Sequence, residues 1–162
     1  MVRNRVPVNY ENKEFDSVII RKPESSDEAS WRELFDGYQR FYRAVIEEEA
    51  IAETWRRIHD PDAEVDAFVA EQDGELIGMT HYLFHKSTWA KEDYCYLEDL
   101  FVSKAARGSD AAEKLIAAVE ADATAQGAVR LYWHTQQFNS AARSLYDTVA
   151  IPTSFMVYEK EL

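Results

Sequence analysis

The segment 94–114 constrains the fold more than any other part of the chain, because it joins three local patterns without a break. It opens with apolar and aromatic residues typical of a buried strand, passes through a short loop that contains Arg107 and Gly108, and continues into the alanine-rich stretch 111–126. A helix that starts directly after such a loop presents unpaired backbone N–H groups and the positive end of its dipole to the loop. The segment therefore predicts a strand, an anion-binding loop and a helix.

These residues resemble the acyl-CoA site of the GNAT superfamily of N-acetyltransferases. The resemblance rests on the strand residues 96–102, on Arg107 and Gly108, and on the helix after them, and it extends over about residues 20–158. Asn139 and Tyr146 fall where that superfamily often has functional residues. Within the superfamily, the chain is most similar to the diamine (spermidine/spermine-type) acetyltransferases, through Ile77, Gly78, Tyr82, Trp89 and the run Leu97-Glu98-Asp99. The resemblance implies an acetyl-CoA-dependent enzyme that forms a homodimer.

The size and composition favour one folded domain. The chain has 162 residues, of which 46% are hydrophobic and 13% aromatic, so it can build one core but is too short for two ordinary domains. Residues 1–17 are polar with isolated apolar positions, and we expect an irregular N-terminal arm there, followed by a single N-acetyltransferase domain over residues 18–162. The one cysteine, Cys95, cannot form an internal disulfide and has no partner at metal-ligand spacing. A reducing, cytoplasmic location and no bound metal are the expectation.

The charge balance restricts the partners. With 18 Lys+Arg against 30 Asp+Glu, the net charge of −12 leaves little basic surface for a nucleic acid. No apolar run approaches the length of a membrane span, and the N-terminus lacks the apolar core of a signal peptide. The negative charge either attracts a cationic substrate or reflects only an acidic, solvated surface. We therefore expect a small-molecule amine, and neither a nucleic acid nor a membrane, as the partner.

Hydrophobic periodicity predicts the element order β, α, α, β, β, β, α, β, α, β. This order indicates an α/β protein with a mixed, mostly antiparallel central sheet and helices on both faces, as in the GNAT fold. Asp73-Gly74 predicts a tight hairpin turn, Gly78 a bulge or a close backbone approach, and Asn139 a cap for the helix 140–148. The expected strands span residues 18–21, 67–70, 76–84, 94–102, 129–135 and 154–159.

Two residues are candidates for the proton transfers that acyl transfer from a thioester to an amine requires. Alkylamines have pKa values of about 10.4, so a base must remove a proton at neutral pH, and Glu98 is the candidate base. Regular strand alternation places Glu98 on the face of Tyr96 and Leu100 and points Asp99 the other way. Tyr146 is the candidate acid, because a phenol keeps its proton at neutral pH and can donate it to a departing thiolate. Each has a structural alternative, as a carboxylate that holds a loop and as a core tyrosine.

Aromatic residues are the candidates for the acceptor pocket. The first helix carries an apolar and aromatic stripe, and its polar-tipped members Tyr38 and Tyr42 either wall the pocket or pack in the core. By the resemblance, Trp89 lines the same pocket and Glu98 acts on the amine through water. His81 and His85 lie four residues apart on a predicted strand, so they do not share the helical face that paired metal ligands need, and we expect core or surface histidines.

The cofactor candidates follow the strand, the loop and the next helices. The backbone of Leu100, Phe101 and Val102 is expected to pair with the pantetheine amides, and the loop amides with Arg107 to hold the diphosphate. Asp110 departs from the family pattern, which has glycine there. Its carboxylate either repels the diphosphate and caps the amides that the diphosphate needs, or faces solvent. The full set of cofactor candidates is Leu100, Phe101, Val102, Arg107, Gly108, Ser109, Asp110, Ala111, Ala112, Asn139 and Arg143.

The leading hypothesis from the sequence is an N-acetyltransferase that moves the acetyl group of acetyl-CoA to a primary amine of a polyamine-like or amino-acid-like small molecule. Two alternatives stay open at this point. One is a GNAT-fold module that binds acyl-CoA or another ligand with weakened catalysis, which Asp110 favours. The other is an enzyme that acetylates proteins.

Overall fold

The computed structural model describes residues 17–162, so the expected N-terminal arm lies outside the described residues except for Ser17. Five strands of the described part form one sheet in the order β1-β2-β3-β4-β5. Neighbours from β1 to β4 are antiparallel and β5 is parallel to β4, which confirms the mixed, mostly antiparallel sheet. The strands are β1 (Ile19–Arg21), β2 (Val65–Gln72), β3 (Glu75–His85), β4 (Tyr94–Val102) and β5 (Arg130–Tyr132).

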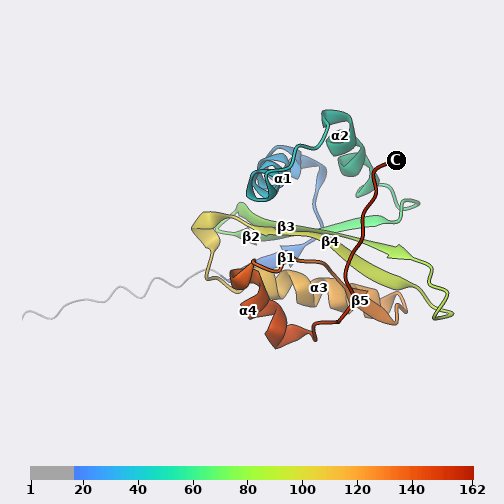
Figure 1. The fold of residues 1–162 in the computed structure, drawn as a ribbon. Helices are drawn as coiled ribbons and strands as arrows, with labels where there is room; N and C mark the ends of the chain where they lie inside the picture. Colours follow the sequence, from blue (N-terminus) through green and yellow to red (C-terminus); the bar gives the residue numbers. More distant parts are fainter. Residues whose placement is uncertain (1–16) are drawn as a thin grey trace, which may run out of the picture.

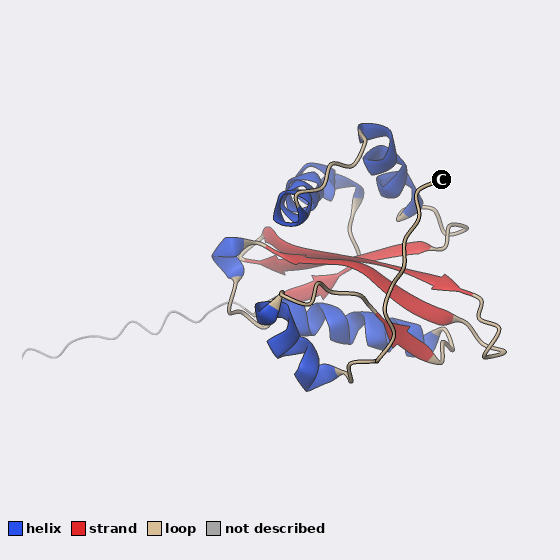
Figure 2. Cartoon of the chain, in the orientation of Figure 1, coloured by secondary structure: helices blue, strands red, loops and turns tan. Residues whose placement is uncertain are grey.

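Helices cover both faces of this sheet, as expected (Figures 1 and 2). One face carries α1 (Glu28–Tyr42) and α2 (Glu48–Arg57), and the other carries α3 (Ala111–Ala125) and α4 (Ser140–Val149). Within the described residues, no helix combines the length and the apolar character that crossing a bilayer demands.

Each face of the sheet has its own hydrophobic core. Under α1, the fully buried Trp31 packs with Val69 and Met79 of the sheet. Under α3, the core is built from one face of the helix, which begins at Ala111. Side chains on opposite sides of a strand alternate, so each strand contributes to both cores. The buried residues of α3 are Ala111, Leu115, Ile116, Val119 and Ala123.

Turn chemistry explains the hairpin between β2 and β3. Asp73 and Gly74 have φ values of 54° and 79°, the left-handed backbone that the Asp-Gly pair predicts. Gly78 meets both expectations made for it. The pairing register shifts beside it, and a Cβ there would lie 3.0 Å from the backbone oxygen of Phe101 and 3.2 Å from Val102. The absence of a side chain at Gly78 thus lets β3 and β4 lie close together.

The start of α4 follows the predicted cap. The Ala142 N–H donates to the Asn139 side-chain oxygen over 3.4 Å, which satisfies one of the unpaired amides of the first turn. No residue of this helix is buried, and most of its side chains are exposed. Leu145 and Tyr146 pack on the core under the sheet.

The prediction of a last strand over residues 154–159 is wrong. Residues 154–159 alternate like a strand, but they have no regular secondary structure, and Phe155, Val157 and Tyr158 are 77%, 64% and 87% exposed. β5 is also shorter than expected, with three residues in place of 129–135. A strand needs a hydrogen-bonded neighbour, and in the described residues β5 is paired on one side only.

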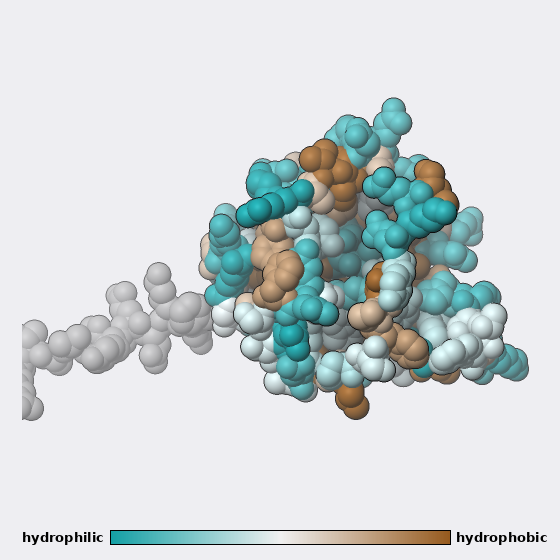
Figure 3. All heavy atoms as spheres, in the orientation of Figure 1, coloured by the Kyte–Doolittle hydropathy of each residue, from teal (hydrophilic) through white to brown (hydrophobic). Residues whose placement is uncertain are grey.

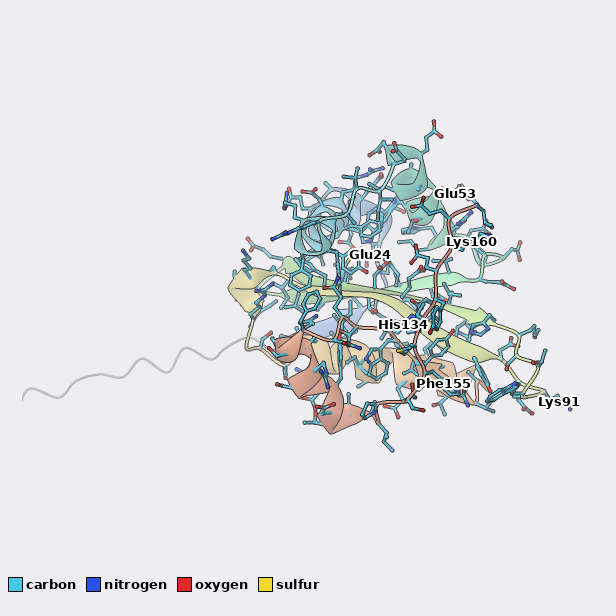
Figure 4. The ribbon with its side chains drawn as sticks, in the orientation of Figure 1. Glu24, Glu53, Lys91, His134, Phe155 and Lys160 are labelled. Carbon is cyan, nitrogen blue, oxygen red and sulfur yellow. The ribbon has the colours of Figure 1, made fainter. Side chains whose placement is uncertain are left out.

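The C-terminal segment lies over the molecule instead of joining the sheet. In the view of Figures 1 and 4 it crosses in front of the sheet, from the α4 side at Phe155 to the α2 side at Lys160. Figure 3 shows the same face, where hydrophilic side chains predominate and apolar ones form separate patches.

Candidate active site

A β-bulge in β4 sets the direction of the two adjacent carboxylates. Asp99 pairs with His81 and Leu97 pairs with Tyr82, so Glu98 is the extra residue on β4. The bulge shifts the alternation by one, and Asp99 comes to the α1 side of the sheet together with His81 and Phe101. The expectation that Asp99 points away from the face of Glu98 and Tyr96 is therefore wrong.

The edge of β4 that faces β5 is open along most of its length. The two strands pair only at Tyr94–Tyr96, opposite Arg130–Tyr132, and the described chain has no further pairing between them. The cofactor candidates Leu100, Phe101 and Val102 lie beyond this point. Their side chains pack in the cores, Phe101 under α1 and the other two under α3. What they offer to a ligand is therefore backbone, as the sequence predicted for this strand.

The loop after β4 leads to the N-terminus of α3 without blocking it. Asp110 occupies the N-cap position but makes no side-chain cap hydrogen bond. Its carboxylate pairs instead with Lys114, 2.9 Å away, and its side chain is 53% exposed. Of the two arrangements open from the sequence, the structure has the one in which Asp110 leaves the first amides of α3 to an anion.

The other residues of the loop support this arrangement. Gly108 has a φ of 88°, a left-handed turn that L side chains rarely adopt. Ser109 Oγ accepts from the Ala111 N–H over a long 3.4 Å, so the first amide of α3 already has a partner. Arg107 lies 6.0 Å from the centre of the Phe41 ring. It lines a groove of about 990 Å³ between α1 and the ends of β3 and β4. The charges of this groove are mixed: the cations are Arg40, Lys104 and Arg107, and the carboxylates are Glu33, Asp36 and Glu75. Ala112 follows in the first turn of α3.

Tyr38 and Tyr42 extend from α1 toward Asp99. Their ring centres are 4.8 Å apart. Burial raises the pKa of Tyr38 far above its ordinary value, and the charge of Asp99 and a hydrogen bond to it raise that pKa further. Burial and the charge of Asp99 also raise the pKa of Tyr42. Both hydroxyls therefore stay protonated at neutral pH beside the carboxylate.

Tyr146 and Asn139 approach the same place from α4. The Asn139 side chain hydrogen-bonds to the Tyr42 hydroxyl, which joins the start of α4 to the end of α1. Burial, followed by the neighbouring Tyr42, raises the pKa of Tyr146 to about 12. A second cavity, of about 540 Å³, lies between these two helix ends and is lined by Phe41, Tyr42 and Asn139 among others. Tyr146 is thus a protonated phenol close to Tyr42, and Tyr42 lines this cavity.

Glu98 stands beside this group, at the mouth of the site. The residue is exposed, yet desolvation raises the pKa of its carboxyl group, and the negative charge of Asp99 raises it further. Tyr96 lies next to the carboxylates and stacks on Tyr132, with ring centres 5.0 Å apart. Desolvation and the charges of Glu98 and Asp99 raise the pKa of Tyr96 to about 12.

Two candidates lie elsewhere. Trp89, expected in the acceptor pocket, is on the loop between β3 and β4 with 74% of its surface exposed, outside the group of tyrosines and carboxylates. The Arg143 guanidinium donates to the backbone oxygen of Gln137 at 2.9 Å, which turns it back along α4.

Sequence reasoning did not assign a role to Asp99 or His81. His81 is 2% exposed and in contact with Asp99, which agrees with the prediction of a core histidine. Among the described residues, no cluster of histidine, cysteine or carboxylate side chains could hold a metal ion. The signal for Asp99 was the adjacent Glu98-Asp99 pair, but only the bulge shows that the two share a face.

Comparison with known proteins places this arrangement in a family. The profile of the Acetyltransferase (GNAT) family matches residues 31–149. The D-amino-acid N-acetyltransferase HPA3 of Saccharomyces cerevisiae is 33% identical over 147 residues, which are 90% of this chain and 91% of the relative. The thialysine N-epsilon-acetyltransferase of Caenorhabditis elegans is 34% identical over 85 residues, about half of each chain.

Solved structures agree in fold. The aminoglycoside N-acetyltransferase AAC(6')-Iy, solved in complex with CoA, has a TM-score of 0.76 over 92% of this chain and 97% of that one, at 18% identity. The finer similarity to diamine acetyltransferases stays a prediction. The family match and the extent of the similarity to HPA3 lead to one conclusion: the chain belongs to the GNAT family and is an acetyl-CoA-dependent N-acetyltransferase.

Proposed function

We propose that the enzyme acetylates a primary amine of a small molecule of the polyamine or amino-acid type. The observation that carries this proposal is the open edge of β4 with two groups near it: the Glu98 carboxylate, whose pKa is raised, and the protonated Tyr146, whose neighbour Tyr42 lines a cavity. The two curated relatives support the same class, since one is named for D-amino acids and the other for thialysine.

The residues around the open edge fit the cosubstrate. The unpaired side of β4 at 100–102 suits the amides of pantetheine, and the first turn of α3, which the Asp110 side chain does not cap, suits a diphosphate with Gly108 and Arg107 before it. The carboxylate of Asp110 is compatible with a bound diphosphate, because its charge is paired with that of Lys114. Bound acetyl-CoA supplies an acetyl group that is activated as a thioester.

Glu98 and Tyr146 have complementary roles in the proposed reaction. The acceptor arrives as an ammonium ion and must lose a proton before its nitrogen attacks the carbonyl carbon. Glu98 accepts that proton, directly or through water, and its raised pKa brings it closer to the pH at which it works. Tyr146 holds a proton at neutral pH and donates it to the departing sulfur. The attacking nitrogen loses a second proton as the C–S bond breaks, and this proton replaces the one that Tyr146 gave. The first proton passes from Glu98 to solvent, so the proton count balances.

The proposal is tested by measuring free-thiol release with acetyl-CoA and a panel of amines. The panel contains diamines and polyamines, D- and L-amino acids, aminoglycosides and a lysine-containing peptide. We expect turnover with at least one of the first two classes, and only weak turnover with the peptide. Preference for the peptide would favour the protein-acetylating alternative. No turnover with any amine, in a protein that binds acetyl-CoA, would contradict the proposal. The homodimer also remains a prediction, which light scattering checks.

A further inference from the structure

Asp99 is held from behind by a buried hydrogen-bonded chain that spans three elements. Trp31 of α1 donates from its indole nitrogen to His81 Nε2 over 2.8 Å, and His81 Nδ1 lies 2.9 Å from Asp99 Oδ2. Trp31 is fully buried and the His81 side chain is 3% exposed, whereas the Asp99 side chain is 14% exposed. The chain therefore runs from the core to the wall of the site.

The direction of these hydrogen bonds sets the charge of the ring. An indole N–H can only donate, so His81 Nε2 must be the acceptor, and the ring proton sits on Nδ1 and is donated to Asp99. His81 is thus neutral in this arrangement, and it orients the carboxylate without cancelling its charge.

The front of Asp99 faces two tyrosines that keep their protons and one neighbouring carboxylate. Tyr38 and Tyr42 reach it from α1, and Glu98 lies beside it on the bulge. Among the described residues around Asp99, the other charged group on this side of the site is therefore a second carboxylate, that of Glu98. Two carboxylates among tyrosine hydroxyls bind a cation well, and a ligand with its own carboxylate next to the cation is repelled.

We propose that Asp99 anchors the acceptor as an ammonium ion and that His81 is a positioning residue that holds the carboxylate for this purpose. The inference rests on the proposed function and narrows its substrate class. The site prefers a terminal alkylamine, as in a diamine or the side chain of lysine, over an α-amino group, because the latter brings a carboxylate one carbon away.

Lysine carries both kinds of amine, so the position of acetylation tests the preference within one molecule. We expect mainly Nε-acetyllysine from the parent protein, read by mass spectrometry. Asp99→Asn should shift the ratio of products toward the Nα form by roughly fivefold or more, because one of the two repelling charges is gone. Asp122→Asn is the matched control, since this carboxylate accepts a hydrogen bond from Tyr82 near α3 on the other side of the sheet. It should leave the ratio unchanged.

A binding measurement separates this inference from the proposed function. The CoA-loaded protein is titrated calorimetrically with 1,5-diaminopentane, and Asp99→Asn should weaken binding roughly tenfold or more. If the parent acetylates no amine, the proposed function fails, and this titration still decides on Asp99. Equal affinities and equal product ratios in the parent and in Asp99→Asn would overturn the inference.

Testing the role of His81 requires a measurement other than stability, because a histidine that only packs in the core would also affect folding. His81→Phe keeps a ring but loses the donor to Asp99, and it should raise KM for the amine roughly five- to tenfold with a smaller change in kcat. His81→Asn can still donate from the δ position and should recover most of the parent KM. If both variants fold and His81→Asn is no better than His81→Phe, His81 acts by packing alone. Should His81→Phe not fold, His81→Asn with a KM as high as that of Asp99→Asn would likewise mean that His81 acts by packing alone.

Discussion

At the scale of single residues, Tyr146 offers the sharpest test of the chemistry. Burial holds the pKa of its hydroxyl at about 12, so the group is a proton donor over the whole working range of pH. Tyr146→Phe removes only the hydroxyl, and we expect kcat to fall by roughly 10²–10⁴-fold with little change in the affinity for acetyl-CoA. Steady-state kinetics and calorimetry on the same variant check both parts.

The control for this variant is Tyr158→Phe, which removes the same group from a residue that is 87% exposed on the C-terminal segment. Its kcat should equal that of the parent. If Tyr146→Phe is also unchanged, Tyr146 is a core tyrosine, which was the structural alternative from the sequence.

Single residues also show how far the sequence could be followed. The types and order of Glu98, Asn139 and Tyr146 were sufficient to predict candidate site residues, and their roles stay a prediction. In the structure Asn139 and Tyr146 both lie near Tyr42, and Glu98 lies near Asp99. The direction of Asp99 was not predictable, because strand alternation assumes a regular register and one inserted residue reverses it. The contact of Asp99 with His81 depends on this reversal.

At the scale of elements, the loop before α3 makes a prediction about Asp110→Gly. Because Asp110 is paired with Lys114 and half exposed, the substitution should leave acetyl-CoA affinity within about threefold. The free energy of unfolding should fall by a few tenths to about 1 kcal/mol, since glycine loses the ion pair and the acid's favourable place near the helix dipole.

Calorimetry with acetyl-CoA and urea denaturation measure the two effects separately. Asp110→Asn serves as the control, because asparagine remains a good N-cap residue without the charge. Binding that tightens by tenfold or more in both variants would mean that Asp110 acts against the diphosphate after all.

Strands, which need a neighbouring strand, were harder to predict than helices and turns, which form from the local sequence. The helices α1 and α3 follow their apolar stripes, and the turn at Asp73-Gly74 follows from backbone preference. Residues 154–159 have the alternation of a strand and no paired neighbour in the described chain. Strand propensity describes how a segment fits a sheet and does not supply the sheet.

At the scale of the whole molecule, the buried tyrosines predict how stability depends on alkaline pH. The pKa values of Tyr96 and Tyr146 are raised to about 12, above the value of about 10 for an unfolded chain. A group whose pKa is higher in the folded state stabilises the fold below the unfolded value, and this contribution is lost as the pH rises through the folded value. The free energy of unfolding should therefore fall between pH 10 and pH 12.

Urea denaturation at pH 8, 10 and 11 measures this dependence. Lysine ion pairs weaken in the same range, so the comparison of variants isolates the tyrosines. Tyr146→Phe should make the fall less steep, and Tyr158→Phe should not change it. An equal slope in all three proteins would show that the Tyr146 hydroxyl is not linked to folding.

The pairing between β4 and β5 stops after three residue pairs, so the rest of the β4 edge has no strand beside it in the described chain. The described chain joins these strands through three residue pairs, and everything after Tyr132, including α4 with Asn139 and Tyr146, is attached to the sheet through this short contact and through packing. A ligand whose amides bond to the open side of β4 takes the place of the missing pairs. If the pantetheine amides bond there, as proposed, the cosubstrate is also a structural component, and we expect the half of the site that carries Tyr146 to be most firmly attached when acetyl-CoA is bound.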